Sequence, residues 1–152
     1  MKLLLAVMAA SQAFSSRLQA ALAPFDLALA EFEVLVRVGK SGTEETRAGG
    51  VRMSDLAAAG LLTSSGLTRL VDRLERRGLL ERRPAADDAR GRTVILSAEG
   101  RALLPRADAA FARELDAMLR DAGVTKKDIG PTLELLGRIQ ETCAAGPSRS
   151  PA

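Results

Sequence analysis

Residues 53–80 read MSDLAAAGLLTSSGLTRLVDRLERRGLL, and their pattern predicts two helices joined by a tight turn. Ser54 is placed to cap the first helix and Thr63 or Ser64 to cap the second, because a side-chain oxygen there can accept a free backbone N–H. Gly78 is placed to end the second helix in the left-handed conformation. Within the second helix, apolar residues at i, i+3, i+4 and i+7 predict one buried stripe: Leu67, Leu70, Val71 and Leu74.

The opposite side of the second helix is polar. It carries Ser64, Ser65, Thr68, Arg69, Asp72 and Arg73. The free N–H groups and the positive dipole at a helix N-terminus suit a phosphate, and short hydroxyl side chains allow the helix to approach the floor of a DNA groove. The pattern therefore predicts a helix-turn-helix whose second helix can meet a nucleic acid.

A β-hairpin is predicted directly after these helices. Its strands are residues 79–83 and 92–96, residues 84–91 join them, and Arg90 and Arg92 stand at the tip. A hairpin in this position is a wing, and an arginine at its tip can enter the minor groove, where the negative potential of DNA is concentrated. We expect a mainly α protein with a small β-hairpin wing (α+β), a winged helix-turn-helix with a helical dimerisation region.

The positive charge of the chain lies in its middle. The net charge is only +3, but residues 51–101 hold ten Arg against seven acidic residues, and the segments on either side are balanced. The planar guanidinium fits phosphates and guanine edges, so this segment is the candidate nucleic-acid surface. A solvated charged face in a chain that uses Arg in place of Lys explains the count equally well.

Composition argues against an enzyme. The chain has no His and one Cys, Cys143, which removes Ser–His and Cys–His pairs, ordinary zinc sites and an intrachain disulfide. Asp, Glu and Ser stand in helix-face and capping positions, so we expect no catalytic residue, no metal and no cofactor. We interpret Cys143 as a buried structural residue in preference to a redox sensor.

The N-terminal residues predict two helices. The first covers residues 2–22 and stops before Pro24, and Asp26 is placed to cap a second that ends at Gly39. The first ten residues imitate a signal peptide, but helical spacing continues past the supposed cleavage point. No run approaches the roughly 20 apolar residues that span a bilayer. We therefore expect a cytoplasmic protein without membrane contact.

Two further helices are predicted at the C-terminal end, from residue 98 to about 121 and from a Thr125 cap to about 145. Together with the first helix they present more apolar surface than a small winged domain can cover, which favours a homodimer over an intramolecular bundle. The expected organisation is N-terminal helices at 1–38, a winged lobe at 39–97, dimerisation helices at 98–145 and a disordered tail at 146–152.

These features resemble the MarR family of bacterial winged helix-turn-helix regulators. The matching motifs, in the order and spacing of the family, are DLA at 55–57, TRLVDRLE at 68–75, GLL at 78–80, and DAR at 88–90 with VILSAEG at 94–100. The likeness extends over residues 2 to 143. It implies a homodimer held by its terminal helices, recognition helices in major grooves of a pseudo-palindromic operator, wings in the adjoining minor grooves, and a repressor relieved by a small phenolic or anionic ligand.

The resemblance also assigns residues. The DNA contacts it implies are Thr63, Ser64, Ser65, Thr68, Arg69, Arg73, Arg90 and Arg92. Asp88 and Arg90 would form the internal ion pair of the wing, a structural role of equal weight to DNA contact. The chain departs from the family in three places. Gly66 stands where a larger residue is usual, the turn glycine is shifted to Gly60, and the loop at 39–50 is longer than usual.

An effector site follows from the same resemblance. Its candidate residues are Phe14, Arg17, Phe25, Phe32 and Phe111, although packing explains the four Phe equally well. The alternative function is a winged-helix dimer that acts through a protein partner or binds DNA without an effector. Gly66 keeps this alternative open, because it removes one groove contact.

Overall fold

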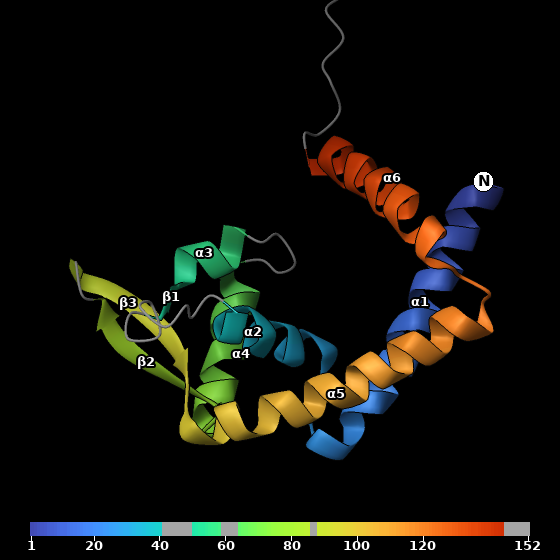
Figure 1. Cartoon of the computed structure of the whole chain (residues 1–152). Coiled ribbons are helices and arrows are strands. Elements are labelled where there is room, and N and C mark those ends of the chain that lie inside the picture. The colour runs from blue at the N-terminus through green and yellow to red at the C-terminus, as the bar shows by residue number, and fades with distance from the viewer. Residues whose placement is uncertain (41–49, 59–63, 86–87, 145–152) are drawn as a thin grey trace, which may run out of the picture. The chain divides into compact units, whose positions relative to one another are not determined.

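The computed structural model describes residues 1–40, 50–58, 64–85 and 88–144 of the chain (Figure 1). Its elements are α1 (Lys2–Leu22), the 3-10 turn η1 (Ala23–Phe25), α2 (Leu29–Lys40), β1 (Val51–Arg52), α3 (Met53–Ala58), α4 (Ser64–Arg76), β2 (Leu80–Ala85), β3 (Asp88–Leu96), α5 (Ala98–Asp121) and α6 (Lys126–Ala144). The predicted fold class, mainly helical with a small hairpin wing, is confirmed. The chain forms two compact units, Met1–Glu114 and Leu115–Ala152.

The sheet of the first unit is antiparallel, with the strand order β1-β3-β2. Val51 pairs with Val94, and Leu80 pairs with Leu96. Both hairpin strands are longer than predicted, since β2 continues to Ala85 and β3 begins at Asp88. Proline cannot donate to a strand ladder, yet Pro84 lies within β2 and pairs with Arg92. The register shifts directly after Pro84, an irregularity that tolerates proline.

The core of the first unit lies between α4, α2 and the sheet. The predicted stripe of α4 is buried as expected, and its members are Leu67, Leu70, Val71 and Leu74. They join one apolar cluster with α2 and the inner face of the sheet, including Phe32, Leu35, Leu80 and Val94. Burial of each such side chain is worth about 1.5–3 kcal/mol, so this cluster fixes the orientation of α4.

The end of α4 is held by a glycine turn. Gly78 has φ of +72°, and the N–H of Leu79 donates to the Leu74 carbonyl at 2.9 Å, which confirms the predicted left-handed cap. Ser97 connects this turn to α5, because its Oγ donates to the Gly78 carbonyl and accepts the Gly100 N–H. A Cβ at Gly100 would lie 2.2 Å from the Leu79 oxygen, so only glycine permits this close approach.

Two predicted helix caps are wrong. Asp26 does not cap α2: it follows the 3-10 turn with φ of +53°, and α2 begins at Leu29. The Glu31 carboxylate accepts the Ala28 N–H at 2.8 Å instead, so the acceptor comes from inside the helix. Ser54 also lies inside its helix, and its Oγ donates to the Asp55 carboxylate at 3.3 Å.

The second unit contains the end of α5 and all of α6. Gly123 has φ of +68° and ends α5. The N–H and the hydroxyl of Thr125 both donate to Asp128 Oδ2, at 2.8 and 2.6 Å, and these bonds fix the start of α6 at the predicted position. They lower the pKa of Asp128, because they stabilise its charged form.

Candidate nucleic-acid interface

The outer face of α4 is the centre of the candidate interface. Ser65, Thr68 and Arg69 are all exposed there, on the side opposite the buried stripe. Ser64 begins α4, but its side chain lies outside the described part of the structure, and so does all of Thr63. The described part of α4 therefore exposes the hydroxyls of Ser65 and Thr68 and the guanidinium of Arg69, while its apolar stripe packs in the core.

A buried carboxylate fixes the C-terminal end of this helix. The side chain of Glu31 is only 5% exposed, and its oxygens accept Arg73 Nε at 2.6 Å and Arg77 Nη1 at 3.0 Å. Glu31 also accepts the Ala28 N–H at the start of α2. One side chain thus joins the N-terminal end of α2 to the C-terminal end of α4. The sequence interpretation assigned Glu31 no role.

Arg82 makes the corresponding connection between α4 and the wing. From β2 its guanidinium contacts the carboxylates of Asp72 and Glu75, each at 2.5 Å. Burial alone would lower the pKa of Arg82, but the hydrogen bond to Asp72 and the negative charge of Glu75 outweigh burial and raise it. Asp72, grouped with the polar face of the helix from sequence, thus holds the strand that carries the wing.

The wing itself is described in part. Arg92 is exposed on β3 opposite Pro84, and the exposed Arg83 on β2 pairs with Glu81 at 3.2 Å. Asp88 and Arg90 belong to β3, but their side chains lie outside the described part, so the predicted wing ion pair stays a prediction.

The structure gives individual contacts for the five predicted effector residues. The rings of Phe32 and Phe111 pack together with centroids 4.8 Å apart, and Phe25 lies 5.9 Å below the guanidinium of Arg106. Phe14 is 39% exposed on α1. On the same helix, Arg17 pairs with Glu114 of α5 at 2.6 Å.

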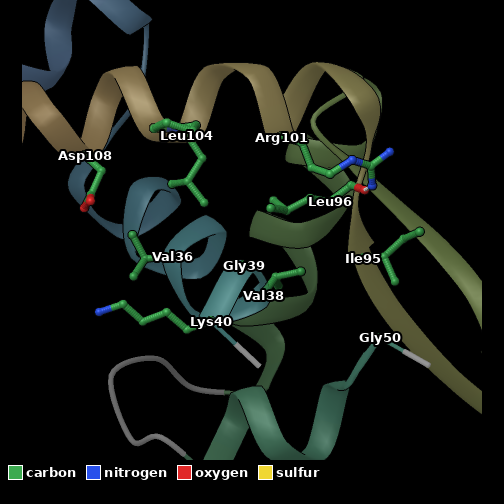
Figure 2. Close-up of a pocket in the computed structure, with 11 residues that line it drawn as sticks. Val36, Val38, Gly39, Lys40, Gly50, Ile95, Leu96, Arg101, Leu104 and Asp108 are labelled. Atoms are coloured by element: carbon green, nitrogen blue, oxygen red, sulfur yellow. Dashed lines mark hydrogen bonds between the residues drawn. The ribbon is translucent and has the colours of Figure 1, made fainter. Parts of the chain in front are cut away.

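A cavity of about 580 Å³ opens elsewhere in the first unit (Figure 2). Its walls come from the end of α2, from β3 and from the start of α5, and the lining residues are Val36, Val38, Gly39, Lys40, Gly50, Ile95, Leu96, Arg101, Leu104, Pro105 and Asp108. None of the five predicted effector residues is among them. The sequence pattern offered no signal for this cavity, because its walls meet only in the folded chain.

Metal sites and membrane-spanning helices are absent from the described residues. These residues contain no group of three or more His, Cys, Asp or Glu side chains that could hold a metal ion. No described helix is both long and apolar enough to cross a membrane.

Residues 25–91, which include α2, the helix-turn-helix and most of the wing, match the model of the MarR family. Over these residues the chain is similar to the MarR family. Wild-type MarR from E. coli in its apo form is 25% identical to it, with a TM-score of 0.69 over 88% of this chain and 93% of the other. Among curated protein sequences, none matches this chain.

Two further solved structures share the fold. AbsC, a MarR family transcriptional regulator from Streptomyces coelicolor, is 24% identical with a TM-score of 0.79, over 92% of this chain and 90% of the other. A cysteine-to-serine mutant of E. coli MarR, complexed with operator DNA, is 24% identical with a TM-score of 0.77, over 91% and 94% of the two chains.

Proposed function

We propose that this chain is a sequence-specific regulator of transcription that binds double-stranded DNA as a homodimer. The observation that carries the proposal is the division of α4 into a buried apolar stripe and an exposed face with Ser65, Thr68 and Arg69. A helix so anchored can enter a major groove without rearrangement. The structure of a MarR protein of the same fold with operator DNA supports DNA as the ligand.

The arginines have different roles in this proposal. Arg69 reads a base edge, because a guanidinium on the outer face of a recognition helix can bind guanine through two hydrogen bonds. Arg73 contacts the DNA backbone. The Nε–H of Arg73 donates to Glu31, and 53% of the Arg73 side chain is exposed. The two terminal amino groups of Arg73 are therefore the atoms that would meet a phosphate. Arg90 and Arg92 belong to the wing contact.

Exposed apolar residues support the homodimer. On α1, Leu4, Leu5 and Met8 are 57–60% exposed, and on α6 Leu133 is 64% exposed. A second copy that covers these surfaces would remove them from water, which is the usual reason for contiguous exposed apolar surface. The dimer would present two recognition helices about 34 Å apart to successive major grooves of a pseudo-palindromic operator.

In this proposal the protein is a cytoplasmic repressor. A small phenolic or anionic ligand relieves its binding to DNA. The predicted ligand residues are Phe14, Arg17, Phe25, Phe32 and Phe111. The exposed ring of Phe14 and the half-exposed side chain of Arg17, both on α1, support this assignment. The contact between Phe32 and Phe111 is ordinary core packing and lends it no weight.

Titration of the purified protein against DNA tests the proposal. The duplexes are the intergenic DNA upstream of its own gene and a random duplex of equal length, each at two salt concentrations. We expect tighter binding to the native duplex and a log–log salt slope of about −0.9 for each phosphate contacted. Equal, weak binding to both duplexes would instead favour a winged-helix dimer that acts through a protein partner.

A further inference from the structure

Two arginines at the C-terminal end of α4, Arg73 and Arg77, share the Glu31 carboxylate but are bound in different ways. Arg77 is held by several acceptors of the protein. Its Nη1 donates to Glu31 Oε2 at 3.0 Å, and its Nη2 donates to the Asp26 carbonyl at 2.5 Å and lies 3.1 Å from Asp26 Oδ2. Only 26% of its side chain is exposed. Arg77 is therefore a structural link between α4 and the turn that precedes α2.

Arg73 uses its Nε atom for the same carboxylate. Nε donates to Glu31 Oε1 at 2.6 Å, a short charge-assisted hydrogen bond. The guanidinium is planar and holds its N–H groups in a fixed fork, so a bond at Nε restricts the direction of the two terminal amino groups. The Arg73 side chain is 53% exposed, whereas that of Glu31 is 5% exposed. An exposed cation is therefore held at one atom by a buried carboxylate.

Glu31 is a rigid support for that bond. Its side chain is buried at the start of α2, where Oε2 also accepts the Ala28 N–H at 2.8 Å and the Nη1–H of Arg77. A long arginine side chain loses conformational freedom when it binds a phosphate, and a side chain that is already restricted loses less. Two parallel N–H bonds to one phosphate also require a defined orientation of the guanidinium plane. The bond to Glu31 supplies such an orientation before DNA arrives.

We propose that Glu31 is a positioning residue for DNA binding, which holds the guanidinium of Arg73 so that its two amino groups bind one phosphate. This role rests on the proposed DNA binding and adds to it a residue that is itself too buried to meet a phosphate. A carboxylate near DNA ordinarily repels the phosphates, so its removal strengthens binding. Removal of the Glu31 charge should instead weaken binding, because the orientation of Arg73 is lost.

A double-mutant cycle measured by fluorescence anisotropy tests this role on the native and the random duplex. The random duplex suffices on its own, because nonspecific binding at low salt needs no operator. Arg73→Ala should weaken binding and make the log–log salt slope shallower by about 0.9, the value for one phosphate. Glu31→Gln should weaken binding roughly threefold to tenfold in the wild-type background. It should cause no further loss in the Arg73→Ala background, where it still removes the charge that Arg77 meets.

Two variants separate orientation from charge and from stability. Glu33→Gln makes the same charge change on α2, where Glu33 pairs with Arg37 at 3.0 Å, and should not weaken binding. Arg73→Lys keeps the positive charge, but an ammonium has no fork that binds Glu31 and a phosphate in one plane. It should weaken binding roughly threefold to tenfold and leave the salt slope unchanged. Circular dichroism at the assay temperature verifies that each variant is folded, and Arg73→Lys carries the test if Glu31→Gln fails to fold.

The Nε–H resonance of Arg73 in NMR spectra, assigned by its absence in Arg73→Lys, reports the bond directly. We expect slow exchange of this proton with water in the free and the DNA-bound protein, and faster exchange in Glu31→Gln. An equal loss of affinity from Glu31→Gln with and without Arg73, or wild-type affinity in Arg73→Lys, would overturn the proposal. Equal affinity for the native and the random duplex would instead refute sequence-specific regulation, and the cycle on the random duplex would still decide the role of Glu31.

Discussion

Replacement of Glu31 by glutamine tests whether the buried carboxylate holds α4 in place. Glutamine keeps the volume and an oxygen for the Ala28 N–H, but it removes the negative charge that faces Arg73 and Arg77. A hydrogen bond to a charged group is worth about 1.5–3 kcal/mol. Arg73 is 53% exposed and Arg77 is 26% exposed, so water replaces part of the lost interaction. We expect a loss of about 2 kcal/mol of unfolding free energy.

Glu33→Gln is the matched control on the same helix. Glu33 pairs with Arg37 at 3.0 Å, but both side chains are more than one third exposed. Such an i,i+4 pair contributes only about 0.3–0.5 kcal/mol. Urea unfolding followed by circular dichroism, at one fixed protein concentration, measures both variants. If Glu31→Gln costs no more than Glu33→Gln, the carboxylate does not anchor α4 and the reasoning is refuted.

Three further predictions concern other local contacts. Gly78→Ala should destabilise the protein by about 1–2 kcal/mol in the same unfolding assay. The cost comes from the φ of +72° alone, because an added Cβ would have no atom within 4 Å. Arg82→Met removes both ion pairs between β2 and α4 and should lower the free energy of unfolding by about 1–3 kcal/mol. An unchanged unfolding midpoint would show that these ion pairs do not stabilise the wing. The lowered pKa of Asp128 implies that its bonds to Thr125 stabilise the start of α6 above the ordinary pKa of 3.8 and are lost as the pH falls through the lowered value. Helical circular dichroism should therefore decrease over that acidic range in the wild type more than in Asp128→Asn.

The sequence predicts most of the local structure because local structure depends on neighbouring residues. The stripe of α4 repeats every three to four positions, Gly78 ends that helix, and α1 and α5 occupy the predicted residues. The sequence predicts Asp26 as a cap, because it precedes an apolar run. The 3-10 turn that contains Pro24 moves the start of α2 beyond it, to Leu29.

The contacts that position the site join distant parts of the chain. Glu31 meets Arg73 and Arg77, which lie 42 and 46 residues away, and no sequence period connects such positions. The cavity has the same property, since Lys40 and Leu104 come from separate helices. The residue types in the sequence therefore predict the outer face of α4. The contacts of Glu31 that hold α4 and the lining of the cavity become visible only in the folded chain.

The most direct test of the central claim compares Arg69→Ala with the wild type on the native and the random duplex. Arg113→Ala is the matched control, since it removes an exposed arginine from α5. If α4 reads DNA, Arg69→Ala should weaken binding to the native duplex by about 1–3 kcal/mol and leave the random duplex nearly unchanged. Arg113→Ala should alter neither. Equal losses of Arg69→Ala on both duplexes, or losses no larger than those of Arg113→Ala, would contradict a recognition role for this face.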